Sequence, residues 1–144
     1  MGYTVKWEAP QSLANILTTE LNSLASATLS AAGAELDNST GLYLFADFVL
    51  SVTYGTNPTA GGYVALYLTE ALDGSTHSDV QRELTSQLVG SFPLRATTSA
   101  QKIVLRGVQL PPFKIKPYVD NQAGQAMAAS GNTLAWARYN VQAA

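Results

Sequence analysis

With 144 residues, the chain is long enough for one domain that buries its own core, and it combines 47% hydrophobic with only 12% charged residues. The formal net charge of −2 and the scattered basic residues exclude the clustered positive surface that phosphates require, so no nucleic-acid partner is expected. The chain has no cysteine and no apolar run near the roughly 18 residues of a membrane span, which excludes disulfides and thiolate chemistry and argues against a membrane partner.

Two parts of different character are predicted: an N-terminal arm over residues 1–20, extended or partly helical, and a single β domain over residues 21–144. The arm lacks the basic start and apolar core of a signal peptide, so none is expected. Together with the absence of cysteine, this fits a soluble protein synthesised in a reducing cytosol.

The region where the arm meets the domain carries a mixed signal. Apolar residues recur at helical spacing between residues 13 and 24, Pro10 could begin a helix and Gly33 could end it. The many serine, threonine and asparagine residues oppose a helix, and residues 31–36 could equally be part of a strand. Residues 21–34 therefore stay open between helix and strand.

The periodicity then changes to two. In residues 42–52 every even position is apolar while Asp47 lies on the opposite face, which predicts a long half-buried strand. Residues 63–69 are apolar on both faces, as expected for a central strand of a sandwich. The polar loop that follows, from residue 73 to about residue 85, is longer than most connections between strands, so we expect a mobile loop or a contact loop.

Four further segments of the final third alternate between apolar and polar residues. They are residues 88–96, 103–108, 113–119 and 133–141. Pro93 indicates an edge strand or a bulge, Pro111–Pro112 ends a strand because neither residue donates to a ladder, and residues 120–124 form a predicted turn. About six to eight short strands at this spacing predict an all-β fold, an antiparallel β-sandwich or jelly roll.

Candidate chemical groups are few. The single histidine, His77, lies in the polar loop between Asp73 and Asp79, and these three side chains could hold a metal ion. A flexible loop does not preorganise ligands, however, so a solvated loop histidine is favoured. A serine hydrolase is disfavoured because no Gly-x-Ser-x-Gly elbow occurs and a lone loop histidine is a poor base. No metal or cofactor site is expected.

Two acids on predicted strands, Asp47 and Glu70, could form the carboxylate pair of a glycosidase. We favour a structural role, in which each pairs with Arg95 or Arg106 on a neighbouring strand or faces solvent. For Asp37, capping of a helix or turn is favoured over calcium ligation. The chain is therefore predicted not to be an enzyme and to have no catalytic residues.

The aromatic residues allow two interpretations. Those in predicted strands are Tyr43, Tyr63, Tyr67, Tyr118, Trp136 and Tyr139. Such rings usually fill a core or pack across strands, which we favour over exposed rings that stack on sugars. Tyr3 and Trp7 differ because they lie in the arm, which has no core of its own. For these two we predict docking on a partner or on a neighbouring subunit.

Several strand and turn signatures resemble a family of small virion proteins of tailed bacteriophages. They are residues 37–48 (DNSTGLYLFADF), 93–96 (PLRA), 105–112 (LRGVQLPP), 121–126 (NQAGQA) and 129–133 (ASGNT). The resemblance covers about residues 21–139 and matches the first twenty residues least well. It implies a jelly-roll capsid decoration or cement protein, made in the host cytoplasm, which clamps the outer capsid surface of the virion.

The partners that this resemblance implies are the lattice of the major capsid protein and further copies of the chain, as a dimer or trimer. Under this hypothesis the strand at residues 113–119 is a free edge that pairs with a partner strand, and the face with Lys114 and Lys116 meets acidic capsid patches. The alternative is a carbohydrate-binding jelly-roll module of a phage fibre or receptor-binding protein.

Overall fold

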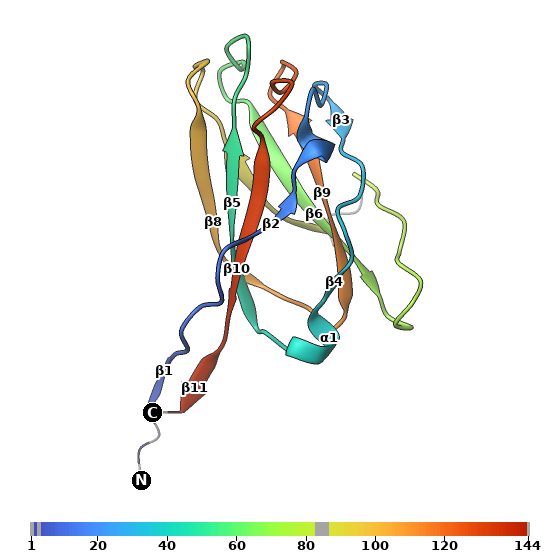
Figure 1. Cartoon of the computed structure of the whole chain (residues 1–144), viewed down its shortest axis with the longest axis vertical. Coiled ribbons are helices and arrows are strands. Elements are labelled where there is room, and N and C mark those ends of the chain that lie inside the picture. The colour runs from blue at the N-terminus through green and yellow to red at the C-terminus, as the bar shows by residue number, and fades with distance from the viewer. Residues whose placement is uncertain (1, 3, 83–86, 144) are drawn as a thin grey trace.

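The computed structural model describes residues 2, 4–82 and 87–143, which form two antiparallel sheets packed face to face (Figure 1). The first sheet consists, in spatial order, of β2 (Ala14–Leu17), β10 (Thr133–Tyr139), β5 (Phe45–Val52) and β8 (Gln101–Gln109). In the second, β9 (Lys114–Gln122) and β6 (Tyr63–Ala71) are central, and β7 (Leu88–Pro93) pairs with β6. Two short strands, β3 (Thr28–Leu29) and β4 (Leu36–Asp37), share the other edge of β9.

The order in which the chain visits the two sheets defines the fold. After β2 in the first sheet, the chain forms β3 and β4 in the second sheet and then β5 in the first. It next forms β6 and β7 in the second sheet, β8 in the first, β9 in the second and finally β10 in the first. This is a jelly roll, so the predicted all-β antiparallel fold is confirmed. In the part of the chain that is described, no helix is both long and apolar enough to span a membrane.

The two longest apolar patterns form the centre of the sandwich. In β5 every even residue from Ala46 to Val52 is buried and every odd residue is partly exposed, as the alternation predicts. In β6, residues 64–69 are all buried, because the outer face of this strand is covered as well. Part of that cover is the loop after β6, in which Ser78 donates its N–H to the Glu70 carbonyl and Arg82 reaches Asp120 on β9. The described part of this loop, up to residue 82, thus makes contacts with the protein's own second sheet.

The helical interpretation of residues 13–24 is wrong. Ala14–Leu17 is strand β2, paired with β10, and only Thr19–Leu21 form a single 3₁₀ turn. Ile16 and Leu17 are buried in the core between the sheets. Helical spacing reflects only local sequence. At the edge of β10 this segment gains backbone hydrogen bonds and buries Ile16 and Leu17, so pairing with β10 makes it a strand and not a helix.

Residues 28–37 form two strands because of a proline on the neighbouring strand. Ser30 and Gly33 donate their N–H groups to the carbonyls of Val119 and Pro117, which shows that these residues of β9 point their backbone groups toward this segment. Pro117 has no N–H to return at that point. The ladder is interrupted there, and β3 and β4 remain as separate short strands on either side.

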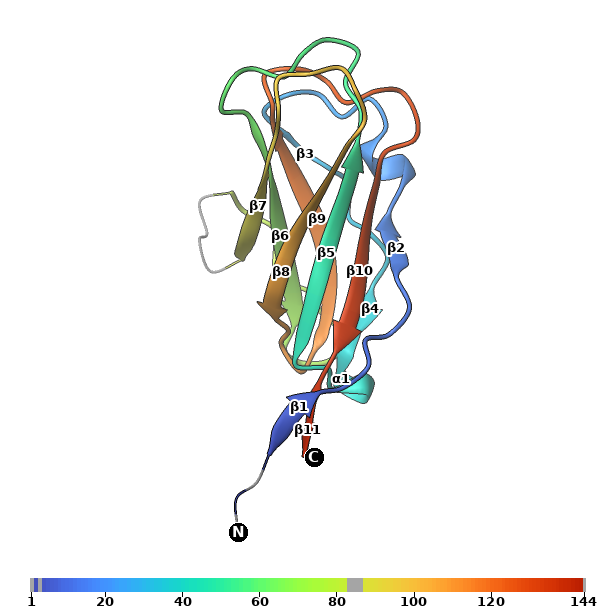
Figure 2. The same ribbon diagram turned by 90° about the vertical axis from the view of Figure 1, so that its left-hand side faces the viewer.

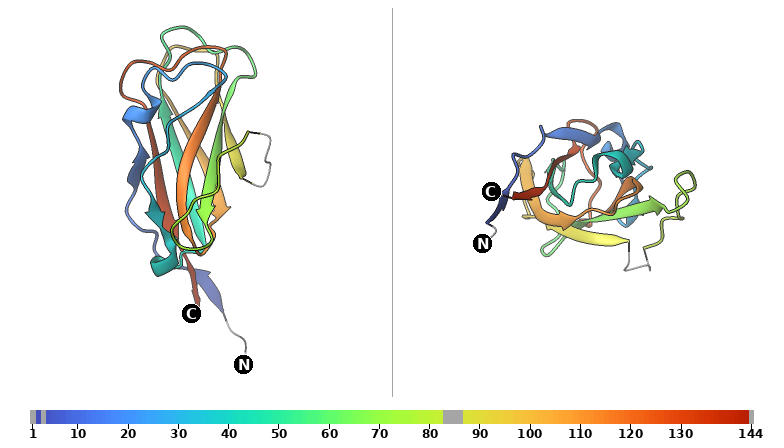
Figure 3. Two further views of the ribbon diagram at one scale, coloured as in Figure 1. Left: turned by 90° about the vertical axis from the view of Figure 1, so that its right-hand side faces the viewer. Right: turned by 90° about the horizontal axis from the view of Figure 1, so that it is seen from below.

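The expected arm is shorter than residues 1–20 and is not free. Strand β1 (Val5–Trp7) pairs with β11 (Val141–Ala143), and the N–H groups of Glu8 and Gln11 donate to carbonyls of residues 140 and 138. The N-terminal segment therefore runs along the C-terminal one until β2 begins at Ala14. The β1–β11 ribbon projects from one end of the sandwich, opposite the end where most of the connecting loops gather (Figures 2 and 3).

Strand β9 is not an edge, contrary to the prediction for residues 113–119. It pairs with β6 along its whole length on one side and with β3 and β4 on the other. An alternating pattern shows which side chains are buried but not how many neighbours a strand has. Of the two positions predicted for Pro93, an edge strand or a bulge, the edge is confirmed, since among the described strands β7 pairs only with β6.

Candidate functional site

Three aromatic rings gather where the ribbon leaves the sandwich. Phe45 and Tyr139 are directly paired across β5 and β10, and their rings stack with centroids 5.8 Å apart. The Trp7 ring packs edge-on against both, at 5.5 Å from Tyr139 and 6.0 Å from Phe45. The three rings thus hold one another in place through ring contacts. Because 66% of Trp7 is exposed, the cluster is also open to the surface.

A pocket of about 290 Å³ lies beside the cluster. Its lining residues are Trp7, Glu8, Pro10, Asp47, Ala137 and Tyr139. The Tyr139 hydroxyl donates to Asp47 Oδ1 at 2.9 Å, and the Gly107 N–H donates to the same oxygen at 2.8 Å. Gly107 has a φ of 65° where the β5–β8 register shifts, a conformation that suits glycine. Burial and the Asp47 carboxylate raise the pKa of Tyr139, so its hydroxyl keeps the proton that it donates.

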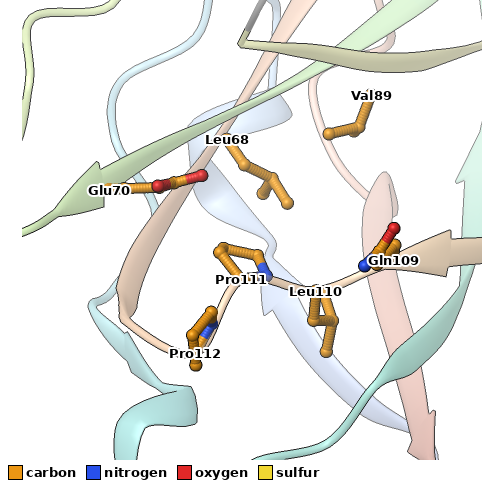
Figure 4. A pocket seen from close by; sticks show the side chains of 7 residues that line it. All are labelled: Leu68, Glu70, Val89, Gln109, Leu110, Pro111 and Pro112. Carbon is orange, nitrogen blue, oxygen red and sulfur yellow. The ribbon is translucent and has the colours of Figure 1, made fainter.

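For Asp47 we expected either a pair with Arg95 or Arg106 or a position facing solvent. Among the described residues it forms no ion pair with either arginine, and it is partly exposed. Nor does it form a carboxylate pair with Glu70, since Asp47 lies on the first sheet and Glu70 on the second. Glu70 instead lines a separate pocket of about 310 Å³ at the side of the sandwich. Figure 4 shows this pocket, which is formed by Leu68, Glu70, Val89, Gln109, Leu110, Pro111 and Pro112. With a single carboxylate, that lining offers no acid and base pair.

The predicted binding residues occupy two different faces. Trp7 lies against the outer face of the first sheet, whereas Lys114 and Lys116 point outward from β9 in the second, where they alternate with buried residues. Tyr3 lies outside the described residues. The structure thus does not bring Trp7 together with Lys114 and Lys116. Lys114 is already engaged, since its Nζ lies 3.4 Å from Glu35 Oε1.

The prediction of a solvated His77 is wrong. Only 8% of its side chain is exposed, and its Nε2 lies 2.7 Å from Glu35 Oε2. The hydrogen bond to His77, and secondarily Lys114, lower the pKa of Glu35. Over the described residues, no group of three or more histidine and acidic side chains is arranged to hold a metal ion. This cluster joins the loop after β6 to the segment before β4.

Asp37 caps a helix, as predicted. Its Oδ1 accepts the Ser39 N–H at 2.8 Å at the start of α1 (Asn38–Gly41). The Ser39 hydroxyl and amide hydrogen bonds lower the pKa of Asp37. The fully buried Asn38 follows: its Nδ2 donates to carbonyls of Tyr43 and Pro111, which fixes the turn into β5.

A similar cap in the loop after β6 gives a pH prediction. The amides of Thr76 and Ser75 donate to Asp73 Oδ1 and lower the pKa of Asp73 from 3.8 to about 2. A depressed folded-state pKa stabilises the fold above the unfolded-state value, and this contribution is lost as the pH falls from about 3.8 to about 2. Asp73→Asn should therefore flatten the pH dependence of the unfolding free energy in that window.

Urea denaturation at pH values between 2 and 5 measures this effect. Asp79→Asn is the matched control, because among the described contacts its carboxylate accepts no loop amide. An unchanged acid dependence in Asp73→Asn would contradict the assignment.

Part of this site had no signal in the sequence. The outward position of Asp47 was predicted, but nothing indicated that β1 pairs with β11, because strands of three residues carry no periodicity. The position of Trp7 over Phe45 and Tyr139 follows from that pairing alone.

The comparisons with known proteins identify no family. No family model matches the sequence, and no curated protein matches it. Similar solved structures include the CBM36-1 domain of a multidomain xylanase from the hindgut metagenome of Trinervitermes trinervoides. It has 12% identity and a TM-score of 0.48, and the alignment covers 96% of this chain and 97% of that domain.

Two others have a TM-score of 0.34. A chain of the Kashmir bee virus empty particle at acidic pH has 10% identity, with 98% of this chain and 92% of that chain covered. The N-terminal cellulose-binding domain of Cellulomonas fimi β-1,4-glucanase C has 11% identity, with 99% and 89% covered. Identities and TM-scores of this size carry no information on function.

Proposed function

We propose that the chain is a non-enzymatic structural protein of a tailed-bacteriophage virion, which decorates the outer capsid surface and cements the assembled shell. The observation that supports this most directly is the exposed apolar surface at the terminal end of the molecule. Val5, Trp7 and Val141 are 65%, 66% and 37% exposed there. Exposed apolar groups gathered at one end of a folded domain are typical of a protein interface.

A cement protein needs no chemistry. It binds the assembled lattice and not the free capsid subunit, so it shifts the equilibrium toward the shell by mass action. The major capsid protein lattice is the proposed partner, and the projecting ribbon is the element that would reach it. A ribbon of two short strands is marginally stable by itself in water, and added contacts on the capsid would stabilise it.

We further propose a homo-oligomer, a dimer or trimer, because linked copies gain avidity on a repeating lattice. The molar mass in solution, measured by light scattering, checks this part. A strictly monomeric chain at the concentrations found in infected cells would remove the avidity argument but not the capsid-binding proposal.

The proposal as a whole is tested on particles. Virions should contain the chain in many copies on the outer surface, visible by cryo-electron microscopy, and particles lacking it should open at a lower temperature. Adding the purified chain back should restore their stability. Absence of the chain from purified particles would overturn the proposal.

One observation favours a second candidate, a carbohydrate-binding module of a phage fibre or receptor-binding protein. The open Trp7 ring lies beside the Asp47 carboxylate, and sugar sites combine an aromatic face with hydrogen-bond acceptors. A glycan array with the purified chain tests this function. Binding that is abolished by Trp7→Ala would establish it, and an empty array would exclude it.

A further inference from the structure

We infer that the pocket beside Trp7 receives a basic side chain of the protein partner, an arginine, between two aromatic rings and two carboxylates. The inference rests on the proposed function, because it specifies what the capsid surface presents to this face. The sequence had predicted that basic residues of this chain, Lys114 and Lys116, meet acidic patches of the capsid. These lysines lie on the other sheet, and at the pocket the acidic groups belong to this chain and the basic group to the partner.

The aromatic part of the pocket has the geometry of a cation site. The ring planes of Trp7 and Tyr139 meet at 80°, with centroids 5.5 Å apart, so they form two walls at nearly a right angle. Both rings line the pocket. Cations are attracted to the faces of aromatic rings, most strongly to tryptophan, and a planar guanidinium also stacks on them.

The charged part of the pocket is unbalanced. Glu8 and Asp47 both line it, and neither forms an ion pair with any described residue. Asp47 uses Oδ1 for the Gly107 amide and the Tyr139 hydroxyl, which are neutral donors. Two carboxylates beside a ring at neutral pH favour an occupant with positive charge.

Among the described residues, no lysine or arginine lines the pocket or forms an ion pair with Glu8 or Asp47. The Arg138 guanidinium lies 4.6 Å from the Tyr43 ring centroid and 5.0 Å from that of Trp136, away from the pocket. Lys6 is exposed on β1 and is not among the residues that line the pocket. Arg106 is exposed on β8 and forms no ion pair with any described carboxylate.

Size separates this ligand from an oligosaccharide. The pocket volume of about 290 Å³ is at the lower limit of about 300 Å³ found for small-molecule sites, so it suits one long side chain better than several sugar rings. Sugar hydroxyls can donate to these carboxylates, but a guanidinium donates to them and also compensates their charge.

The two tryptophans allow a direct test by NMR. We would titrate the protein with acetyl-Gly-Arg-Gly-amide and follow the two indole N–H signals. The Trp7 signal should shift, with a dissociation constant of about 1 mM for so small a probe. The Trp136 signal serves as an internal reference, because this residue is only 4% exposed. The same peptide with citrulline in place of arginine keeps the shape without the charge and should shift Trp7 little.

Charge variants identify the residues responsible. The double variant Glu8→Gln, Asp47→Asn should weaken arginine-peptide binding about tenfold. The side-chain amide oxygen that Asp47→Asn introduces can still accept the Gly107 and Tyr139 hydrogen bonds. Glu70→Gln, which removes an unpaired carboxylate from the other pocket, should leave binding unchanged. Equal shifts with the citrulline peptide, or a Trp7 signal that responds to sugars and not to arginine, would overturn the inference.

Particle binding separates this inference from the proposed function. If the wild-type chain binds capsids and the Glu8, Asp47 double variant binds as tightly, the inference fails while the decoration role stands. If the arginine peptide shifts Trp7 but the wild-type chain never binds capsids, the pocket assignment stands and its capsid partner is wrong.

Discussion

Replacing Asn121 by leucine should destabilise the protein on the order of 4 kcal/mol, because a buried side chain loses four hydrogen bonds at once. Asn121 is fully buried on β9. Its Nδ2 donates to the carbonyls of Leu24 and Gln125 at 2.9 and 2.8 Å, and its Oδ1 accepts the Tyr54 hydroxyl at 3.1 Å and the Ala123 amide at 3.2 Å. Leucine matches the volume but makes none of these four hydrogen bonds. The Leu24 carbonyl keeps the Met127 N–H as a donor at 3.0 Å, whereas the Tyr54 hydroxyl and the Ala123 N–H lose their acceptor.

The matched control is Tyr54→Phe, which removes one donor of the same network. It should cost about 1 kcal/mol, the usual net contribution of one hydrogen bond. Burial raises the pKa of Tyr54, so its hydroxyl stays a donor throughout the neutral range. Urea denaturation with a common slope measures both variants. A loss in Asn121→Leu no larger than that in Tyr54→Phe would mean that Asn121 does not organise this region.

The second large effect is expected at Gly33, which is close to residues of both β2 and β9. A Cβ atom there would lie 2.7 Å from the Ile16 carbonyl oxygen, 2.7 Å from Pro117 Cγ and 3.0 Å from Leu17 Cδ2. A backbone oxygen and a proline ring cannot rotate away, so Gly33→Ala must push the segment off the sheet. We expect a loss of about 2 to 3 kcal/mol from this overpacking.

Gly55→Ala is the control for that substitution. No atom lies within 4 Å of a Cβ at Gly55, and its φ is not in the left-handed region. Alanine should be neutral there or stabilise by up to about 1 kcal/mol, because it restricts the unfolded chain. Thermal unfolding of both variants decides the matter: equal melting temperatures would show that the close approach at Gly33 is relaxed in solution.

These two positions also show why local sequence was misleading. Residues 120–124 have the polar, glycine-containing composition of a turn, yet Asp120 and Asn121 continue β9 and are buried. Gly33 was expected to end a helix, but it lies between β3 and β4, where a Cβ atom would clash with Ile16 and Pro117. The structure at Asn121 depends on Leu24, which is distant in sequence, and the structure at Gly33 depends on Ile16, which belongs to another strand.

The sequence by itself determined the long strands of the sandwich, β5 to β10, but not the short strands β2, β3 and β4. The structure agrees with the period of two in β5 and with the apolar residues on both faces of β6, since alternation of side chains is a local property of a pleated strand. It also agrees with the edge position of Pro93 on β7 and with the end of β8 before Pro111–Pro112. The Asp37 cap was predicted for the same reason, because it involves neighbours two residues apart.

Only the tertiary structure decided which strands are neighbours, and with that the candidate site. Pairing of β1 with β11 joins the two ends of the chain and places Trp7 over Tyr139; pairing of β9 on both sides removes it as a free edge. The contacts of His77 with Glu35 and of Asp47 with Gly107 join residues far apart in sequence. Such pairings depend on the geometry of the whole sandwich, which the spacing of residues along one strand does not encode.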